Sequence, residues 1–309
     1  VVEYPVGGGR RVHAVSGVTV AVRKGETLGL VGESGSGKSS LARALLQLPP
    51  PQGGSVQFDG QDLTKLGGKA LRAVRPRLQM IFQDPIASLN PRRRVAEIIA
   101  EPLIVCGVAD AAERTRRVRA VMEAVGLDPD LVWNRRPHEF SGGQCQRIAI
   151  ARALVLEPSL IVCDEPVSAL DVSIRAQILN LLEDMKARFG LTLLFIAHDL
   201  AVVKSVSDRV AVMYLGRLCE VASSEDLFAS PAHPYTAALM AAIPEPDPDI
   251  PLGDTKLKPG DPPSPLDPPS GCRFRTRCPH AEKRCTSEVP ALREIAPGRE
   301  VACHFPLVA

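Results

Sequence analysis

One stretch near the start of the chain has the residue types and spacing of a phosphate-binding loop. Residues 32–39 read Gly-Glu-Ser-Gly-Ser-Gly-Lys-Ser, which fits the pattern G-x-x-x-x-G-K-S. Glycines let a backbone approach phosphate oxygens closely, and the loop amides and the following helix N-terminus point at the anion. In this pattern Lys38 reaches the β- and γ-phosphates, and Ser39 holds Mg²⁺. The other nucleotide contacts expected from the loop are Gly32, Ser34, Gly35, Ser36, Gly37 and Ser40.

The segments on either side give this loop the strand–loop–helix context that the motif requires. Residues 27–31 are a short apolar run, as expected of a buried parallel strand. Residues 40–48 are good helix formers, and a run of prolines that starts at Pro49 ends the predicted helix. A chance glycine-rich turn is the simpler interpretation, and this context disfavours it.

A second apolar run ends in two adjacent carboxylates. Residues 160–163 are apolar throughout and are followed directly by Asp164 and Glu165. In a protein with a phosphate-binding loop, a carboxylate at such a strand tip supports Mg²⁺, and this role falls on Asp164. Glu165 is placed to polarise a water against the γ-phosphate. A solvated acidic strand end is the alternative, but a strand this apolar is expected to be buried on both faces.

A second loop of small residues also precedes a predicted helix. Ser141, Gly142, Gly143 and Gln144 lead into residues 146–156, which are helical in character. A loop at a helix N-terminus favours anions. One domain does not need two phosphate sites for one nucleotide, so this loop predicts a site that is completed across a dimer.

The elements that must position these residues indicate an α/β fold. Apolar strands alternate with helical segments, which predicts a mostly parallel sheet with right-handed crossovers. Short strand patterns at residues 18–22 and 53–60 predict an additional antiparallel β subdomain. Helical spacing over residues 95–105 and 109–125 predicts a helical subdomain at about residues 84–155.

Composition limits the classes of protein that fit. The chain has 309 residues, and its net charge of +2 gives no electrostatic case for a nucleic-acid partner. We found no apolar run near the ~20 residues that a membrane-spanning helix needs, so a membrane role requires separate membrane subunits. The chain starts at Val1 rather than methionine, which we interpret as a fragment or one half of a fused double ATPase.

Composition also predicts the domain boundaries. Residues 1–243 carry the motifs and form the expected ATPase domain. In residues 244–269, ten of twenty-six residues are proline, which predicts a semi-rigid extended connector. Residues 270–309 then form the expected cysteine-rich C-terminal module.

Over residues 1 to about 235, these motifs resemble, in their order, the ATP-binding subunit of an ABC transporter. The resemblance implies that residues 32–39 are the phosphate loop, residues 141–144 the signature loop, and Asp164 and Glu165 the metal carboxylate and the catalytic base. It also implies catalytic roles for Gln83 of the Q-loop, which contacts Mg²⁺ or the water, and for the switch histidine His198.

The same resemblance assigns two further contacts. Asp171 ends the D-loop Ser-Ala-Leu-Asp. Tyr4 is the expected aromatic that stacks on adenine, with His13 as its rival. Cys145 departs from the family pattern, which usually has a charged or polar residue after the signature loop, and we expect this change to be tolerated. The implied mechanism holds two ATP molecules between two such domains, whose closure and reopening drive the membrane subunits.

The C-terminal region resembles that of oligopeptide/dipeptide importer ATPases. The segments that carry this resemblance are His-Pro-Tyr-Thr at residues 233–236, Gly-Asp-Pro-Pro-Ser-Pro at 260–265, Gly-Cys-Arg-Phe at 271–274 and Arg-Cys-Pro at 277–279. It implies ATP-driven import of short peptides at the cytoplasmic face of the membrane. The implied partners are a second ATPase domain, two transmembrane permease subunits and an extracytoplasmic peptide-binding protein.

Other functions remain open at this point. Relatives of similar sequence carry nickel, glycans or antimicrobial peptides, and the ATPase itself never touches the cargo. A soluble ABC-type ATPase of DNA repair or translation is a rival, although no coiled-coil insertion or basic linker is evident. A metal or redox sensor with a structural ATPase is a second rival, and the intact Glu165 and His198 argue against it.

Four of the eight cysteines gather in the C-terminal region. Cys272, Cys278, Cys285 and Cys303 are separated by 5, 6 and 17 residues, which are not the gaps of common zinc fingers. The family resemblance favours a 4Fe–4S cluster, which four thiolates suit chemically. Zn²⁺ and free or oxidised thiols are the alternatives. We interpret the remaining cysteines as packing residues: Cys106, Cys145, Cys163 and Cys219.

Overall fold

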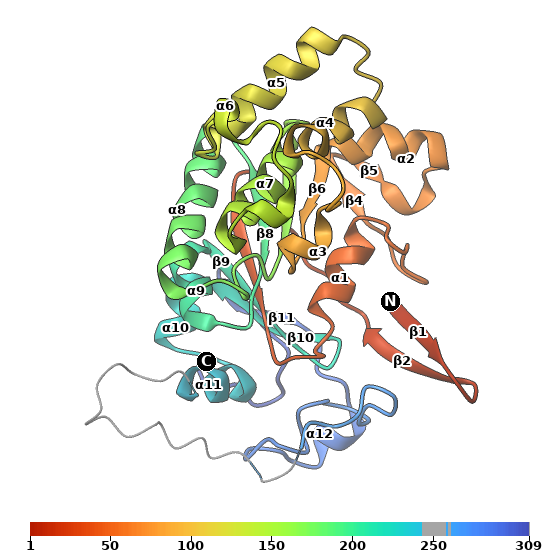
Figure 1. The fold of residues 1–309 in the computed structure, drawn as a ribbon. Coiled ribbons are helices and arrows are strands. Elements are labelled where there is room, and N and C mark those ends of the chain that lie inside the picture. Colours follow the sequence, from red (N-terminus) through yellow and green to blue (C-terminus); the bar gives the residue numbers. More distant parts are fainter. Residues whose placement is uncertain (243–257, 259–260, 309) are drawn as a thin grey trace. The chain divides into compact units, whose positions relative to one another are not determined.

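The computed structural model describes residues 1–242, 258 and 261–308, and these residues form two compact units (Figure 1). The first unit comprises Val1–Ala21, Thr27–Thr64 and Ala197–Ala309. The second comprises Val22–Glu26 and Lys65–Ile196. The chain therefore crosses between the units several times, and no simple cut in the sequence separates them.

In the first unit, strands from both ends of the chain form a mixed sheet. β3 (Thr27–Val31) is buried along its whole length and pairs in parallel with β9 (Arg209–Tyr214). β9 then pairs antiparallel with β10 (Arg217–Ser223), β10 with β12 (Arg299–Val301), and β12 with β11 (Arg293–Ala296). Every residue of β3 is buried, including Thr27, which indicates that both faces of the strand are covered.

The other elements of the first unit are short. α1 (Lys38–Leu45) starts directly after the phosphate loop. Two antiparallel hairpins form at β1–β2 and β4–β5. Their bounds, and those of the other elements in this unit, are β1 Val2–Val6, β2 Arg10–Val15, β4 Gln57–Phe58, β5 Gln61–Asp62, η1 Leu63–Lys65 (whose last residue belongs to the second unit), α9 Leu200–Val206, α10 Ser224–Ala229, α11 Pro234–Ala241 and α12 Arg284–Ser287.

The second unit contains three parallel strands and most of the helices. β7 (Leu160–Asp164) lies between β8 (Thr192–Ile196) and β6 (Leu78–Ile81), and all three are parallel. The helices are α2 Gly68–Val74, η2 Arg75–Arg77, α3 Pro85–Ser88, α4 Val95–Val105, α5 Ala111–Ala124, α6 Pro129–Val132, η3 Pro137–Glu139, α7 Gly142–Leu154 and α8 Val172–Phe189. The helices predicted from spacing over residues 95–105 and 109–125 are thus present as α4 and α5.

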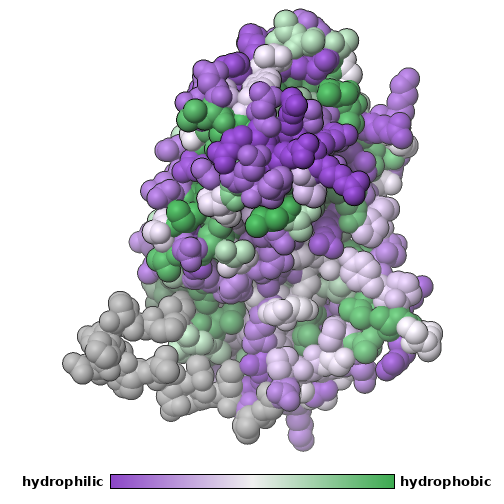
Figure 2. Space-filling model, viewed as in Figure 1, coloured by the Kyte–Doolittle hydropathy of each residue, from purple (hydrophilic) through white to green (hydrophobic). Residues whose placement is uncertain are grey.

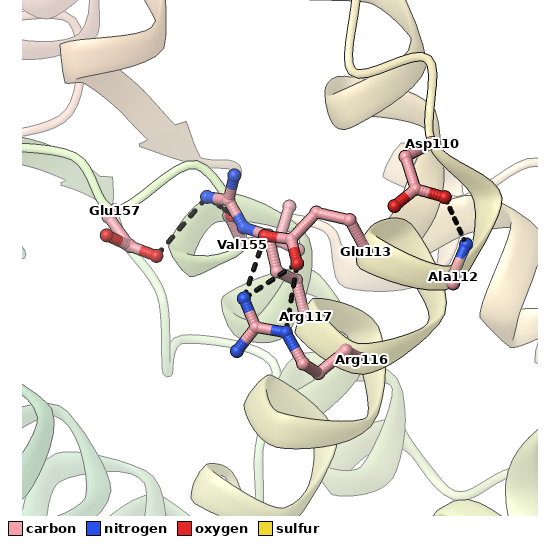
Figure 3. Close-up of polar contacts among 7 residues, drawn as sticks. All are labelled: Asp110, Ala112, Glu113, Arg116, Arg117, Val155 and Glu157. Carbon is pink, nitrogen blue, oxygen red and sulfur yellow. Dashed lines mark hydrogen bonds and ion pairs between the residues drawn. The ribbon is translucent and has the colours of Figure 1, made fainter.

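Polar contacts anchor α5 within its unit (Figure 3). Asp110 caps the helix, since its carboxylate accepts the backbone N–H of Ala112 at 3.0 Å. Arg117 donates to the carbonyl of Val155 at 2.7 Å and pairs with Glu157 at 3.3 Å, which joins α5 to the residues just after α7. On the face drawn in Figure 2, hydrophilic side chains cover most of the region that holds α5. The buried residues of α5 are Val118, Val121 and Met122, so one side of the helix packs against the protein.

Two expectations about the N-terminal part and the connector need revision. Residues 18–22 keep the predicted alternation of half-buried and exposed side chains, but they form no strand. The alternation shows only an extended segment with one side packed against the protein. A strand also needs backbone hydrogen bonds to a neighbouring strand. Most of the predicted connector, residues 244–257 and 259–260, lies outside the described residues, and residues 261–269 contain no helix or strand.

The C-terminal region does not form a unit of its own. Residues 270–308 belong to the same compact unit as the phosphate loop, and β12 extends the sheet by pairing with β10. The prediction of a separate cysteine-rich module is therefore not supported. Composition predicted a domain boundary before residue 270. The pairing of β10 with β12, which joins residues about 80 positions apart, instead places both sides of that boundary in one sheet.

Within the described part of the chain, no helix is both long enough and apolar enough to cross a membrane.

A buried carboxylate holds this C-terminal addition to the sheet. Glu220 of β10 is fully buried and accepts the backbone N–H groups of Ala232 and His233 at 2.9 and 2.8 Å. The guanidinium of Arg299 on β12 lies 3.2 Å from the same carboxylate, with 12% of its side chain exposed. Removal of the carboxylate would leave an uncompensated charge and two buried donors.

We expect Glu220→Ala to lower the free energy of unfolding by about 3–5 kcal/mol, because it breaks a buried ion pair from one side. Urea-induced unfolding of the full chain measures this change. Glu225→Ala on α10 is the matched control, since this exposed carboxylate should change stability by less than about 0.5 kcal/mol. Equal effects of the two substitutions would contradict the assignment.

Candidate functional site

The phosphate loop is closed around its own lysine. Lys38 is buried, and its Nζ donates to the carbonyls of Gly32 at 2.7 Å and Glu33 at 3.0 Å. Ser36 N–H donates to the carbonyl of Glu33 at 3.1 Å, and the carbonyl of Ser36 accepts from Gly216 at 2.8 Å. The loop carbonyls therefore turn toward the lysine, and the loop curls into the shape that presents amides to an anion.

Two glycines of the loop are required by sterics. Gly32 has φ +152°, and a Cβ there would lie 2.1 Å from the carbonyl oxygen of Met213. Gly37 has φ +103°, and a Cβ there would lie 2.0 Å from the carbonyl oxygen of Ala14. Both contacts are with backbone, which cannot move aside as a flexible side chain can. The glycines thus allow the loop to pack against strands β2 and β9.

Glu33, which the motif leaves unspecified, is held by the C-terminal region. Its backbone N–H donates to the hydroxyl of Tyr235 at 2.9 Å. Its carboxylate forms a two-pronged ion pair with Arg277 at 2.9 and 3.0 Å. The segments that contain Tyr235 and Arg277 carry the family resemblance in the sequence, but their contact with the loop was not predicted. The sequence does hold one signal for this contact: an acidic residue in a loop that binds anions needs a cationic partner.

The second unit presents two carboxylates at the end of β7. Asp164 is buried at the last position of the strand. Glu165 follows with φ +48°, a conformation that non-glycine residues adopt at an energetic cost and that recurs at active sites. Its carboxylate accepts a hydrogen bond from Nε2 of Gln83 at 3.0 Å. The structure thus brings together two residues that the sequence placed 82 positions apart.

The signature loop caps α7 and leaves its polar atoms at the surface. Ser141 Oγ accepts the N–H of Gln144 at 3.3 Å, and Gln144 Oε1 accepts the N–H of Ser141 at 3.0 Å, which is a reciprocal capping box. Gly143 packs tightly, because a Cβ there would lie 2.5 Å from a methyl of Ile174. Cys145 is fully buried, and burial raises the pKa of its thiol. The departure from the family pattern therefore faces the interior, away from Ser141 and Gln144.

The remaining predicted residues divide between the units. Asp171 is exposed in the second unit, at the N-terminal boundary of α8. His198 is exposed in the first unit, just after β8 and before the capping residue Asp199. Tyr4 of β1 pairs with Val12 and is half-buried.

The β1–β2 hairpin separates the two candidates for adenine stacking. His13 pairs with Glu3 across the hairpin, and its Nδ1 lies 2.8 Å from the Glu3 carboxylate. Neighbouring residues in a strand point to opposite faces, so His13 lies on the face opposite Tyr4. The hairpin therefore places the two candidates on opposite faces, and the stacking role of Tyr4 stays a prediction.

The four C-terminal cysteines lie near one another. The backbone N–H of Cys272 donates to the carbonyl of Cys285 at 2.8 Å. The pKa of the Cys303 thiol is raised to about 11, mainly by burial and to a smaller extent by the neighbouring thiols of Cys272, Cys278 and Cys285. Cys219, interpreted above as a packing residue, lines a small cavity together with Cys272. Among residues 1–242, 258 and 261–308, no group of three or more His, Cys, Asp or Glu side chains is arranged to hold a metal ion.

Comparison with known proteins identifies the class. The family model described as ABC transporter matches residues 15–168. The solved structure of cbiO1 from Clostridium perfringens, part of the ABC transporter complex cbiONQ, is 27% identical with a TM-score of 0.66, over 74% of this chain and 88% of that one. The ATP-binding cassette MJ0796, solved as a post-hydrolysis dimer with ADP and Pi, is 29% identical with a TM-score of 0.65, over 72% of this chain and 95% of that one.

The C-terminal region narrows the class further. The family model described as oligopeptide/dipeptide transporter, C-terminal region, matches residues 219–285. The oligopeptide transport ATP-binding protein OppF of Escherichia coli is 56% identical over 285 residues, which are 92% of this chain and 85% of OppF. OppF of Salmonella typhimurium is 55% identical over the same shares of the two chains. The chain therefore belongs to the ABC transporter family, as an ATP-binding protein of its oligopeptide/dipeptide group. The predicted P-loop ATPase fold is confirmed, with a mixed sheet where a mostly parallel one was predicted.

We expect Gly37→Ala to reduce ATP binding at least about tenfold, because the new methyl must displace backbone at Ala14 and the residue is strained at positive φ. Calorimetric titration of the full chain with Mg·ATP measures this loss. Gly67→Ala is the matched control, since no described atom lies within 4 Å of that Cβ. Unchanged ATP affinity in Gly37→Ala would show that the loop does not need this close contact.

Proposed function

We propose that this chain hydrolyses ATP to power the import of short peptides through an ABC transporter. The observation that carries the proposal is the intact pair of ATPase elements, the closed phosphate loop around Lys38 and the Gln83–Glu165 contact, in a chain that is 56% identical to OppF. An ABC-type chain that had lost turnover would not need to keep both. The oligopeptide/dipeptide match over residues 219–285 favours peptides over nickel, glycans or antimicrobial peptides as cargo.

The roles of the site residues follow from charge and position. Lys38 and the loop amides bind the β- and γ-phosphates, and Tyr4 stacks on adenine. Ser39, Gln83 and the buried Asp164 are oxygen ligands of the kind that Mg²⁺ prefers, and bound Mg²⁺ neutralises charge on the phosphates. Glu165 accepts a proton from the attacking water, which Gln83 orients through its hydrogen bond to the same carboxylate.

Catalysis on this proposal is positioning plus electrostatic stabilisation, because phosphoryl transfer offers the protein little covalent chemistry. His198 donates to the γ-phosphate as negative charge redistributes toward the leaving group. The strained conformation of Glu165 fixes its carboxylate in advance, so little reorganisation is needed when the water attacks.

The exposed signature loop supports a dimer. Ser141 and Gln144 lie at the surface at the N-terminus of α7, and Asp171 lies at the surface at the start of α8. In the proposed dimer these groups reach the γ-phosphate held by a second ATPase domain, which is a paired subunit or the other half of a fused chain. Closure then assembles both sites, and hydrolysis reopens them.

The same proposal assigns the other partners and the location. ATP-driven closure of the dimer can power transport only if the movement is passed on to the membrane subunits. Two transmembrane permease subunits therefore bind this chain, which lies peripherally at the cytoplasmic face of the membrane. An extracytoplasmic peptide-binding protein delivers the cargo. The oligopeptide/dipeptide C-terminal match supports this assignment over a soluble ABC-type ATPase and over a metal or redox sensor.

We also propose that Cys272, Cys278, Cys285 and Cys303 hold a 4Fe–4S cluster. No comparison bears this out, and no group of three or more His, Cys, Asp or Glu side chains among the described residues is arranged to hold a metal ion. Two observations support the cluster: four thiol ligands suit it chemically, and the backbone N–H of Cys272 donates to the carbonyl of Cys285 at 2.8 Å, which brings two of the four residues together. A cluster spans a larger space than one ion, so its ligands do not need the closer spacing of a zinc site.

Glu165→Gln should keep Mg·ATP affinity within about twofold and lower turnover about 10²–10⁴-fold, because the amide cannot accept the proton. Phosphate release from the full chain and a separate binding titration measure the two quantities. Glu183→Gln on α8 is the control, since this exposed carboxylate should leave both unchanged. Turnover near the wild-type value in Glu165→Gln would remove Glu165 as the base.

The chain, purified without air, should contain iron with a matching amount of acid-labile sulfide and should show a broad visible absorption. Both should be lost in Cys278→Ser and kept in Cys106→Ser, because Cys106 is an exposed cysteine outside this group. Elemental analysis for iron and zinc, a sulfide assay and an absorption spectrum measure this. Zinc without sulfide, or neither metal, would reject the cluster and leave the ATPase proposal standing.

A further inference from the structure

Two residues of the C-terminal region contact the phosphate loop, and both do so through Glu33. Tyr235 accepts the backbone N–H of Glu33 at 2.9 Å, and Arg277 pairs with both carboxylate oxygens of Glu33 at 2.9 and 3.0 Å. One loop residue is therefore fixed at its backbone and at its side chain together. The ion pair joins residues 244 positions apart in the sequence.

These contacts rest on a packed aromatic cluster. Tyr235 is 1% exposed, and its ring lies 4.6 Å from Tyr214 and 5.3 Å from Phe274, measured between ring centroids. Phe274 packs edge-on against Tyr214 at 5.3 Å, and its carbonyl accepts the backbone N–H of Arg277 at 3.0 Å. Such ring contacts restrict the side chains that make them.

The start of α11 aims the hydroxyl of Tyr235. His233 caps this helix by accepting the backbone N–H of Tyr235 at 3.0 Å through Nδ1. Burial lowers the pKa of His233 to about 3, so the ring is neutral and can act as the acceptor. The segment from His233 to Thr236 therefore has a structural role, because it holds Tyr235 against the phosphate loop.

The Glu33–Arg277 pair is sheltered from solvent. The side chain of Arg277 is 13% exposed and that of Glu33 is 30% exposed. Screening by salt is weak for partly buried pairs, so the guanidinium neutralises the carboxylate effectively. Without Arg277, a carboxylate in the phosphate loop would stand unneutralised beside a polyanionic nucleotide and oppose its binding.

We propose that Arg277 and Tyr235 are positioning residues for ATP, which neutralise Glu33 and fix the phosphate loop in its binding shape. Neither residue touches the nucleotide in this account, since both act through Glu33. The inference rests on ATP binding at this loop and does not depend on the cargo or on the proposed cluster. It also explains why the oligopeptide/dipeptide C-terminal region belongs to the same compact unit as the loop.

The test measures the dissociation constant of Mg·ATP, and kcat and KM of the basal ATPase, for full-chain variants. Arg277→Met should weaken ATP binding and raise KM about 10-fold or more, since a charge-assisted pair is lost and a carboxylate is left unneutralised. kcat should stay within about twofold, because the catalytic carboxylates are unchanged. Tyr235→Phe keeps the ring and removes the acceptor, and should give a smaller loss of about 3-fold.

Two further variants separate positioning from general destabilisation. Glu33→Gln in the Arg277→Met background should restore most of the lost affinity, because the repelling charge is gone. Arg275→Met is the matched control: this arginine lies two positions earlier and bonds to Ser270 rather than to the loop, so its ATP affinity should equal that of the wild type.

Each outcome decides the inference. Unchanged ATP affinity in Arg277→Met overturns it, as does an equal loss in Arg275→Met or a failure of Glu33→Gln to restore binding. A lower melting temperature at unchanged affinity shows a structural role only and also overturns it. A wild-type chain that binds Mg·ATP without hydrolysing it would contradict the proposed function, and the binding comparison would still test this inference.

Discussion

A loop that binds phosphate through its backbone has too few side-chain contacts of its own to fix its conformation. The neighbouring elements of the first unit must therefore stabilise it. Apart from Glu33 and Lys38 its side chains are small, its amides must face the anion, and its lysine donates to the carbonyls of Gly32 and Glu33. Support must therefore come from outside the loop. Met213 and Ala14 approach the glycines on the β9 and β2 sides, and the C-terminal region holds Glu33.

The catalytic end of β7 meets a related constraint in a different way. Asp164 is fixed by its place in a buried strand, whereas Glu165 comes after the strand and adopts a positive φ. Its conformation costs energy, which the surrounding contacts offset: its N–H donates to the carbonyl of Ile196 at 3.0 Å and its carboxylate accepts from Gln83. A reactive carboxylate is thus held in place by one backbone and one side-chain hydrogen bond.

The C-terminal region shows how one segment can serve both stability and the site. Glu220 and Arg299 join β10 and β12 in the sheet, and Phe274 and Arg277, which lie between them in the sequence, reach the ring cluster and the loop. Cys278 directly follows Arg277, and the thiols of Cys272, Cys285 and Cys303 lie near it. The part of the chain that composition marked as a separate module is thus built into the nucleotide-binding unit.

The sequence by itself determined what depends on neighbours in the chain. The glycine spacing of residues 32–39, the apolar runs that end at Val31 and Asp164, and the capping pair Ser141 and Gln144 act over a few residues, so their order identified the family. The sequence also suggested a strand at residues 18–22, because alternation reports one-sided burial and says nothing of a ladder partner. Only the tertiary structure decided the pairs Glu33–Arg277, Glu220–Arg299 and Gln83–Glu165. Their members lie 79 to 244 positions apart, and no local preference records which distant charge or amide will meet a given carboxylate.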